Sequence, residues 1–378
     1  MTRRLLIGLA VWGAGCGSPA GTRDPGVADS GSLDPGHPEL VSDVPLATDS
    51  RADLDPGSDP DPGPDPDPGP APDPGPALPF PPPGPGFHRM GPAIVDSLGR
   101  TRILHGVNVS NAAKYFPGHL SWHGPQDYTD LAATGIDSVR LLTFWAALMP
   151  TEGVIDDAYI EAYAQRVDWA HQAGLLVIVD MHQDLFGEGF AENGAPRWAC
   201  DEALYASYVP SQPWYVNYLD PGIKACFDRF YADDALFGRF RDAWVAVATR
   251  LKDHPGVVGF DLLNEPYWGS TAADEWVSGI WQPRMEQLTE ALHAIAPNRL
   301  VFFQGTTLSS LGNVDPFVPF ADPDVVFAPH YYHPLVHDGT PYDPSMEDLL
   351  DVAMDGIGQM DGLLGNVPVW VGEFGGPT

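Results

Sequence analysis

The chain has 378 residues, a formal net charge of −32 at pH 7, and 41 glycines and 41 prolines. Its length allows one large hydrophobic core. The acidic excess argues against a nucleic-acid partner, because nucleic acids are bound by basic surfaces.

The first 16 residues have the pattern of an export signal. Arg3 and Arg4 precede an apolar run at 5–11, and small residues at 13–15 precede Cys16,. This order predicts a bacterial lipoprotein signal whose Cys16 is lipidated; an ordinary secretory signal cut nearby is the alternative. The segment is too short to span a membrane. We therefore expect an exported protein, either held in the bacterial cell envelope by an N-terminal lipid anchor or extracellular.

Residues 17–86 are dominated by Asp, Pro and Gly. Such a composition buries too little apolar surface to offset the entropy of ordering, so it predicts a disordered linker. Proline stiffens this segment and like-charged aspartates extend it. A calcium-binding repeat is the alternative, but the Gly-rich nonapeptide period is missing.

Residues 87–378 form the predicted globular domain, in which strand-like and helix-like segments alternate. The predicted strands are 102–109, 136–143, 175–181, one ending at Glu265, 299–304, 324–331 and one ending at Glu373. The predicted helices are 127–134, 156–173, 230–251, 275–295 and 345–364. Alternating units with near-continuous apolar strands indicate a parallel sheet.

An insertion rich in Trp and Tyr follows the third predicted strand, and the chain's other two cysteines lie in this region. Cys200 and Cys226 could pair in an exported protein and pin the insertion. Two free buried thiols are the alternative.

Polar side chains cluster just beyond the predicted strand ends, which is the pattern of a TIM barrel. A doubly wound sheet is less favoured, because no Gly-rich phosphate loop follows the first strand. Only seven strands are found, and the chain stops five residues after Glu373. Since strands one and seven would be open edges, we expect an (β/α)8-type barrel truncated after its seventh strand.

Two of the strand-end residues are glutamates, Glu265 and Glu373. Carboxylates at the tips of separate parallel strands converge on one pocket, and a carboxylate pair is what hydrolysis of a glycosidic bond requires. Glu265 would be the acid/base, with a pKa raised by burial or by a nearby carboxylate. Glu373 would be the nucleophile, kept ionised by charge-assisted hydrogen bonds from Arg140.

The remaining strand-end residues have expected supporting roles. Asn264 offers an amide to a sugar 2-hydroxyl, and Tyr332 offers a hydroxyl to Glu373. His182 and His330 would donate to substrate hydroxyls or orient the carboxylates, and Asp180 would hold His182 or bind the sugar. Each of these residues alone could be structural. The alternative of a histidine metal cluster lacks a nearby His-Glu-x-x-His motif, so we expect no metal and no cofactor.

Taken together, these residues resemble glycoside hydrolase family 5, a family of retaining barrels. The motifs are Asn264-Glu265-Pro266, His330-Tyr331-Tyr332 and Glu373-Phe374-Gly375, with Arg140 and His182. The resemblance implies an acid/base after strand four, a nucleophile after strand seven and a covalent glycosyl–enzyme intermediate, with the carboxylates about 5–5.5 Å apart.

A narrower resemblance is to endoglycoceramidases and related glycosylceramidases. It rests on Asp180-Met181-His182-Gln183-Asp184, on 260–266, and on Lys114, which matches a lysine that these enzymes place near the bound sugar. It implies cleavage between glycan and ceramide, with a glycolipid or oligosaccharide as substrate. The family's eighth strand with its tryptophan, and the β-sandwich domain of endoglycoceramidases, have no counterpart in this sequence.

The leading hypothesis is therefore a monomeric retaining β-glycosidase acting on glycosphingolipids or similar glycosides. An endo-β-glucanase or mannanase acting on polysaccharide is the second enzymatic reading. A non-catalytic carbohydrate-binding barrel is a third, although a binding protein needs neither glutamate. An inactive, truncated barrel is the fourth.

Overall fold

The computed structural model describes residues 86–109, 111–115, 117–337 and 339–376. The predicted signal segment with Cys16, and all of the predicted linker except Gly86, lie outside the described residues. Within the described residues, no helix is both long enough and apolar enough to cross a membrane.

Six parallel strands form the main sheet and pair in sequence order. They are β4 (Gly106–Val109), β5 (Ser138–Thr143), β6 (Leu176–Met181), β7 (Val257–Asp261), β8 (Leu300–Phe303) and β9 (Val325–Phe327). Beyond β9, β10 (His330–Tyr331) pairs in parallel with β11 (Glu373–Phe374), and a bridge joins Phe327 to Val369. The chain thus fills seven consecutive strand positions, and the predicted TIM-type barrel architecture is confirmed.

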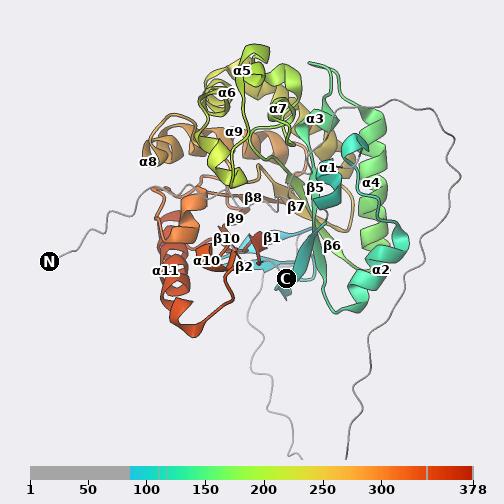
Figure 1. The fold of residues 1–378 in the computed structure, drawn as a ribbon. Coiled ribbons are helices and arrows are strands. Elements are labelled where there is room, and N and C mark those ends of the chain that lie inside the picture. Colours follow the sequence, from blue (N-terminus) through green and yellow to red (C-terminus); the bar gives the residue numbers. More distant parts are fainter. Residues whose placement is uncertain (1–85, 110, 116, 338, 377–378) are drawn as a thin grey trace, which may run out of the picture. The chain divides into compact units, whose positions relative to one another are not determined.

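Helices cover the outside of these strands (Figure 1). The longer ones are α2 (Pro125–Ala133), α4 (Asp157–Gln172), α6 (Pro221–Ala232), α7 (Asp234–Leu251), α9 (Gln282–His293) and α11 (Glu347–Leu364). Helix α4 packs against α2 and α7, and α7 packs against α9. Gly174 follows α4 with φ 87°, so it ends the helix as predicted,.

Shorter helices occupy the connections. They are α1 (Asn111–Tyr115), η1 (Pro117–His119), α3 (Trp145–Leu148), η2 (Glu188–Phe190), η3 (Arg197–Ala199), α5 (Glu202–Ser207), η4 (Trp214–Leu219), α8 (Ala273–Trp276), the π-helical η5 (Val277–Trp281), η6 (Thr307–Leu311), α10 (Pro334–His337) and η7 (Pro344–Met346). The segments η2 to η4 make up the aromatic insertion, and a disulfide between Cys200 and Cys226 joins it to α6.

Two predicted helices are divided in the structure. The segment 230–251 contains the end of α6 and the whole of α7, separated at Asp233. The Asp233 carboxylate accepts hydrogen bonds from the N–H groups of Ala235 and Leu236 and so starts a new helix,. The segment 275–295 changes from α8 through the π turn η5 to α9.

Two predicted strands are also different from the structure. Arg102 does not begin the first barrel strand, which starts at Gly106. It belongs instead to an antiparallel sheet of β1 (His88–Met90), β2 (Ala93–Val95) and β3 (Thr101–Arg102), which the sequence analysis missed. The strand predicted at 324–331 is interrupted between β9 and β10 at Pro329, which has no N–H to donate,.

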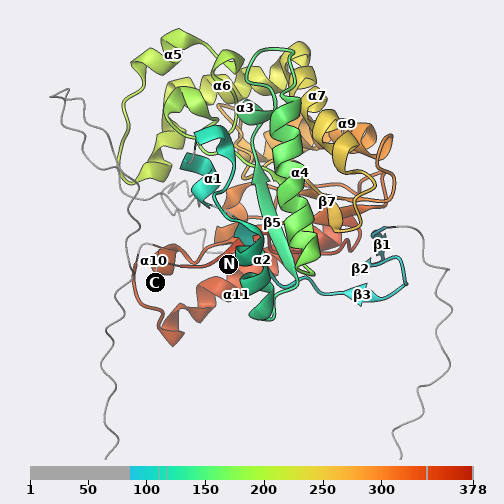
Figure 2. The same ribbon diagram turned by 90° about the vertical axis from the view of Figure 1, so that its right-hand side faces the viewer.

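The antiparallel sheet packs against the interior of the barrel. Phe87, Ile94 and Leu104 form one cluster with side chains of the parallel strands: Ile178, Val258, Leu300, Phe302 and Val326. In Figure 2, β1–β3 lie at one end of the strands, whereas α1 and α10, which follow strands, lie at the other. The antiparallel sheet therefore covers the amino ends of the parallel strands.

Inward-facing positions change from apolar to polar along several strands. Ile178 is followed by Asp180 and His182, Phe302 by Gln304, and Ala328 by His330. Because alternate strand residues share a face, these polar side chains gather inside the carboxyl end of the barrel, opposite the antiparallel sheet.

The outer edge of β4 pairs with no strand among the described residues. Beside this edge runs a groove lined by Val107, Val109, Trp122, Tyr128 and Leu131. Val107 and Trp122 are 41% and 60% exposed, so apolar surface borders a row of unpaired backbone groups.

Candidate active site

Arg140 lies at the centre of the polar cluster, on β5, and is 1% exposed. Its Nε donates to Asp261, its Nη1 to Asn108 and Glu373, and its Nη2 to Asp180 and Asn264. A guanidinium has five N–H donors, and all five have an acceptor here. This buried cation therefore fixes side chains from several strands at once.

Glu373, on β11, accepts a hydrogen bond on each of its two carboxylate oxygens. Arg140 Nη1 donates to Oε1 at 2.6 Å, and the Tyr332 hydroxyl donates to Oε2 at 2.9 Å. Burial raises the pKa of this carboxyl, but the His330 ring and the Arg140 guanidinium lower it by more, so its pKa falls to about 2. Glu373 is consequently ionised at neutral pH, the form that a nucleophile needs.

Glu265, just after β7, has a pKa shifted in the opposite direction from that of Glu373. It is 2% exposed, and burial, reinforced by the charges of Glu373 and Asp184, raises its pKa well above the usual range of a glutamate. Its Oε1 shares a hydrogen bond of 3.0 Å with His330 Nδ1. The raised pKa favours the protonated form of the carboxyl group, which a general acid needs,.

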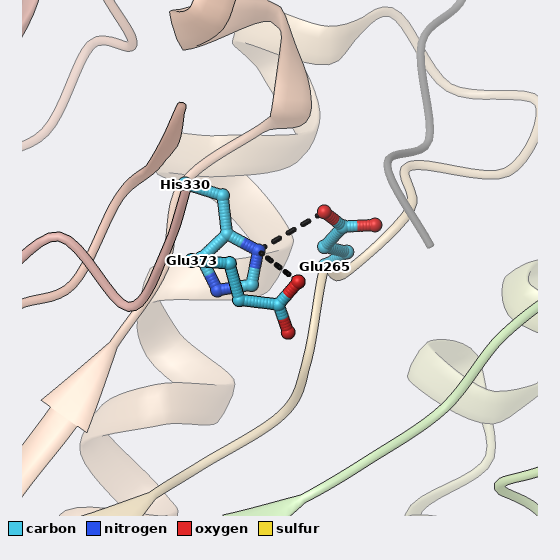
Figure 3. A group of neighbouring side chains, drawn as sticks. All are labelled: Glu265, His330 and Glu373. Carbon is cyan, nitrogen blue, oxygen red and sulfur yellow. Dashed lines mark hydrogen bonds and ion pairs between the residues drawn. The ribbon is translucent and has the colours of Figure 1, made fainter. Parts of the chain in front are cut away.

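His330, on β10, stands between the two glutamates, and its Nδ1 faces both carboxyl groups (Figure 3). The distance from Nδ1 to Glu373 Oε2 is 3.8 Å, longer than the contact to Glu265. Burial lowers the pKa of His330 to about 3, despite the attraction of Glu373. The Nδ1 contact of His330 thus orients the carboxyl group of the acid/base glutamate.

A second series of contacts starts from Asp180, which accepts a hydrogen bond from Arg140. His182 Nδ1 is 2.7 Å from Asp180 Oδ2, and His182 Nε2 is 3.6 Å from Asp184 Oδ2. Lys114, on α1, donates to the same Asp184 oxygen at 2.8 Å. Burial and Lys114 act to lower the pKa of His182, but the neighbouring Asp180 raises it overall.

Asn264 is fully buried beside Glu265. Its Oδ1 accepts from Arg140 and its Nδ2 donates one hydrogen to the Gln183 carbonyl oxygen at 3.1 Å. An amide nitrogen carries two hydrogens, which leaves the second for a substrate hydroxyl.

Several buried polar atoms of the site have no hydrogen-bond partner among the described residues. They include His182 Nε2, Asp184 Oδ1, Asn193 Oδ1 and Glu265 Oε2. Unpaired buried polar atoms destabilise a protein unless water or a ligand completes them. A polyhydroxylated ligand would supply both donors and acceptors at this position.

Glu265, His330 and Glu373 offer ligand atoms within 4.8 Å of one another, a spacing that a metal ion can use. Each is already engaged, however, and the guanidinium of Arg140 lies 2.6 Å from Glu373. A cation bound here would be repelled by this buried positive charge, so the donor set fits a hydrogen-bonded carboxylate pair better.

The structure brings together every sequence-predicted site residue of the barrel: Lys114, Arg140, Asp180, His182, Asn264, Glu265, His330, Tyr332 and Glu373. The atoms of Glu265 and Glu373 within 4.8 Å of one another agree with the short separation of retaining glycosidases rather than the about 6.5–9.5 Å of inverting enzymes,. The Cys200–Cys226 disulfide is not part of this cluster and links the insertion to α6.

Four residues that hold this cluster had no role predicted from the sequence: Asp184, Asp261, Gln183 and Gln304. Burial raises the pKa of Asp261 to about 7, although Arg140 lowers it. Gln304 ends the fifth predicted strand, so the strand-end pattern itself could have identified it. Asp261 is hidden inside an apolar run, and only the contact with Arg140 reveals it.

An α/β barrel with two close carboxyl groups at its strand ends, one with a raised and one with a lowered pKa, defines a class of barrel hydrolases that act through paired carboxylates,. The family description Cellulase (glycosyl hydrolase family 5) matches residues 104–378, and the chain belongs to this family. The family resemblance seen in the sequence is thereby confirmed.

Similar proteins include several endoglycoceramidases. Endoglycoceramidase I of Rhodococcus hoagii (strain 103S) is 35% identical over 256 residues, which are 64% of this chain and 52% of the relative. An endoglycoceramidase of Cyanea nozakii is 27% identical over 280 residues, with 64% and 55% covered. The chain thus spans about half the length of these curated relatives.

Among solved structures, endo-glycoceramidase II from Rhodococcus sp. in a ganglioside GM3 complex has a TM-score of 0.67 and 28% identity. The match covers 72% of this chain and 66% of that chain.

Proposed function

We propose that this protein is a retaining β-glycoside hydrolase that cleaves the bond between glycan and ceramide in glycosphingolipids. One observation carries the proposal: Glu265 and Glu373 lie close together in one buried cluster, in surroundings that shift their pKa values in opposite directions. The pKa of Glu265 is raised and that of Glu373 is lowered to about 2, within one buried cluster. Two carboxyl groups with different roles are the requirement of double displacement.

In the first step, Glu373 attacks the anomeric carbon and forms an ester with the sugar. Glu265 gives its proton to the glycosidic oxygen, the bond between this oxygen and the anomeric carbon breaks, and the alcohol leaves. Arg140 and Tyr332 hold the attacking carboxylate by its two oxygens. His330 holds the proton donor.

In the second step, Glu265 is a carboxylate and accepts a proton from water. The resulting hydroxide equivalent attacks the anomeric carbon, the ester to Glu373 breaks, and the free sugar carries the original configuration. Both glutamates then have their starting protonation states.

The glycan would be held by the polar atoms that lack partners. Asp184 Oδ1 and His182 Nε2 are buried and unpaired, and Lys114 is fixed beside them by its contact with Asp184. The second hydrogen of the Asn264 amide is suited to the sugar 2-hydroxyl, a contact that strengthens in the transition state.

A lipid aglycone is supported by the similar endoglycoceramidases and by the ganglioside bound to the Rhodococcus sp. structure. Exposed apolar side chains also follow the nucleophile and Tyr332 closely in the sequence. Phe374, directly after Glu373, is 73% exposed, and Leu335 on α10 is 46% exposed. Such surface suits an apolar leaving group.

Hydrolysis of a polysaccharide by an endo-β-glucanase or mannanase is the second candidate, and the family description Cellulase favours it. The two candidates share the same carboxylate chemistry and differ only in the aglycone side of the site.

Release of free oligosaccharide from lactosylceramide in detergent tests the proposal, with carboxymethylcellulose in parallel. Release from the lipid alone, abolished in Glu265→Gln and Glu373→Gln, is the expected result. Hydrolysis of carboxymethylcellulose alone would support the second candidate, an enzyme that acts on polysaccharide. Inactivity on both would contradict the proposed function of this chain.

We also propose a three-part organisation: a lipoprotein signal at 1–16 with lipidation at Cys16, a disordered linker at 17–86, and a monomeric barrel exported to the bacterial cell envelope. The sequence pattern around Cys16 supports the anchor, and a long spacer would let the barrel reach a membrane-embedded substrate. Labelling with radioactive palmitate should mark the parent chain and not Cys16→Ala. Equal labelling of both would refute the anchor.

A further inference from the structure

The backbone of Glu265 is in the left-handed region, with φ 41°. This conformation is unfavourable for a residue with a side chain and persists only where surrounding contacts enforce it. Two buried glutamine side chains contact the peptide groups on both sides of this residue. They are Gln183, after β6, and Gln304, after β8, each 3% exposed.

Gln304 holds the amide of Glu265. Its Oε1 accepts the Glu265 N–H at 2.9 Å. Its Nε2 donates to Asp261, at 3.2 Å from Oδ2, and that same Asp261 oxygen accepts from Arg140. Gln304 thus connects the backbone of Glu265 to the cation that holds Glu373.

Gln183 holds the carbonyl groups. Its Nε2 donates to the backbone oxygens of Asn264 and Glu265, both at 2.9 Å. Its Oε1 accepts the Phe186 N–H at 2.9 Å, which fixes the amide in this orientation. The two glutamines therefore leave the peptide groups of Glu265 little freedom to rotate.

Buried glutamines can also serve stability alone, and this protein contains such a case. Gln282 on α9 is 2% exposed, and its side chain bonds both the N–H and the C=O of Val318. It makes the same kind of paired backbone contact, but at a residue with no part in the site. Gln183 and Gln304 differ because both converge on one left-handed glutamate.

We propose that Gln183 and Gln304 are positioning residues that hold the backbone of Glu265 in its left-handed conformation and thereby aim its carboxyl group at the glycosidic oxygen. Neither glutamine is a proton donor or nucleophile in this proposal. Both act through Glu265, and the inference rests on the proposed glycosidase function.

The prediction is a selective loss of acid catalysis. A misplaced acid slows cleavage of the glycosidic bond when the leaving group is poor, such as the alcohol of a ceramide. It has little effect on the rate when the leaving group is 2,4-dinitrophenolate, which leaves without a proton. The parameter kcat/KM reports the step that breaks this bond. The full-length protein is compared with Gln183→Met and Gln304→Met, on lactosylceramide and on 2,4-dinitrophenyl β-lactoside. Gln282→Met is the matched control.

The expected result is a fall in kcat/KM on lactosylceramide on the order of 100-fold in both site variants, with little change on the dinitrophenyl substrate. The basic limb of the pH profile should also move in these variants. Gln282→Met should keep the parent ratio between the two substrates, even if it unfolds at a lower temperature.

Equal losses on both substrates in the site variants, or a changed ratio in Gln282→Met, would overturn the positioning role. A parent protein that hydrolyses neither substrate would instead contradict the proposed function. The two failures are thus distinguishable.

Discussion

Two donors meet the carboxylate of Glu373, the cationic Arg140 from β5 and the neutral Tyr332 from just after β10. Arg140 is shared among five acceptors, whereas the Tyr332 hydroxyl contacts Glu373 at 2.9 Å. Removing the tyrosine hydroxyl therefore destabilises the ionised form of Glu373 relative to its protonated form, while the hydrogen bonds of Arg140 remain.

Tyr332→Phe is expected to raise the pKa of Glu373 and move the acid limb of the kcat/KM profile to higher pH. A hydrogen bond to a charged group contributes about 1.5–3 kcal/mol, which corresponds to roughly one to two pH units. Rates measured from pH 2 upwards check this shift. An acid limb that stays in place would show that the Tyr332 hydroxyl does not contribute to keeping Glu373 ionised.

Glu265→Gln is expected to stabilise the protein at alkaline pH while abolishing activity. The folded-state pKa of Glu265 is raised, so its contribution to stability is complete below the unfolded pKa near 4.5 and is lost as pH rises through the folded value,. Glutamine cannot ionise and escapes this loss.

Thermal unfolding at pH 5 and pH 8 measures the effect, and the gain of Glu265→Gln over the parent should grow with pH. Glu290→Gln, at an exposed position of α9, serves as the control. A gain that is the same at both pH values would contradict the protonated state of Glu265.

At the scale of elements, the sequence predicted which strands end in the site but not how they are tied together. The change from apolar to polar along inward positions is local, so His330 and Glu265 could be found from single segments. Asp261 lies between Phe260 and Leu262, and its pairing with Arg140 spans 121 residues, a distance that no local pattern encodes. The break between α6 and α7 was missed because both helices are amphipathic and only Asp233 separates them.

The disulfide between Cys200 and Cys226 closes a loop with a sequence separation of 26 residues. Replacing both cysteines by serine is expected to lower the free energy of unfolding by about 3 kcal/mol, mainly by releasing the unfolded chain. Urea denaturation measures this loss as a lower midpoint. Because Glu265, Glu373 and Arg140 lie outside the insertion, measurable hydrolysis should remain. An unchanged midpoint would show that the crosslink adds no stability.

At the scale of the molecule, the outer edge of β4 pairs with no strand among the described residues and lies beside the apolar groove, an arrangement that can template pairing with another strand,. We expect the protein to be monomeric when dilute and to self-associate weakly when concentrated. Val107→Lys places a charge on the exposed strand and should suppress this association. Sedimentation velocity over a range of concentrations tests both. Identical concentration dependence of Val107→Lys and the parent would exclude the β4 edge as the contact.

The partners of Arg140 are synthesised one after another on the ribosome. Its partners lie 40, 121 and 233 residues further along the chain, at Asp180, Asp261 and Glu373. A ribosome adding about 5–20 residues per second makes Glu373 roughly 10–50 s after Arg140. The Asp180 and Asp261 carboxylates are therefore available to pair with the guanidinium before Glu373 has been synthesised. The nascent chain can neutralise the Arg140 charge early, yet it has no nucleophile until its seventh strand is synthesised.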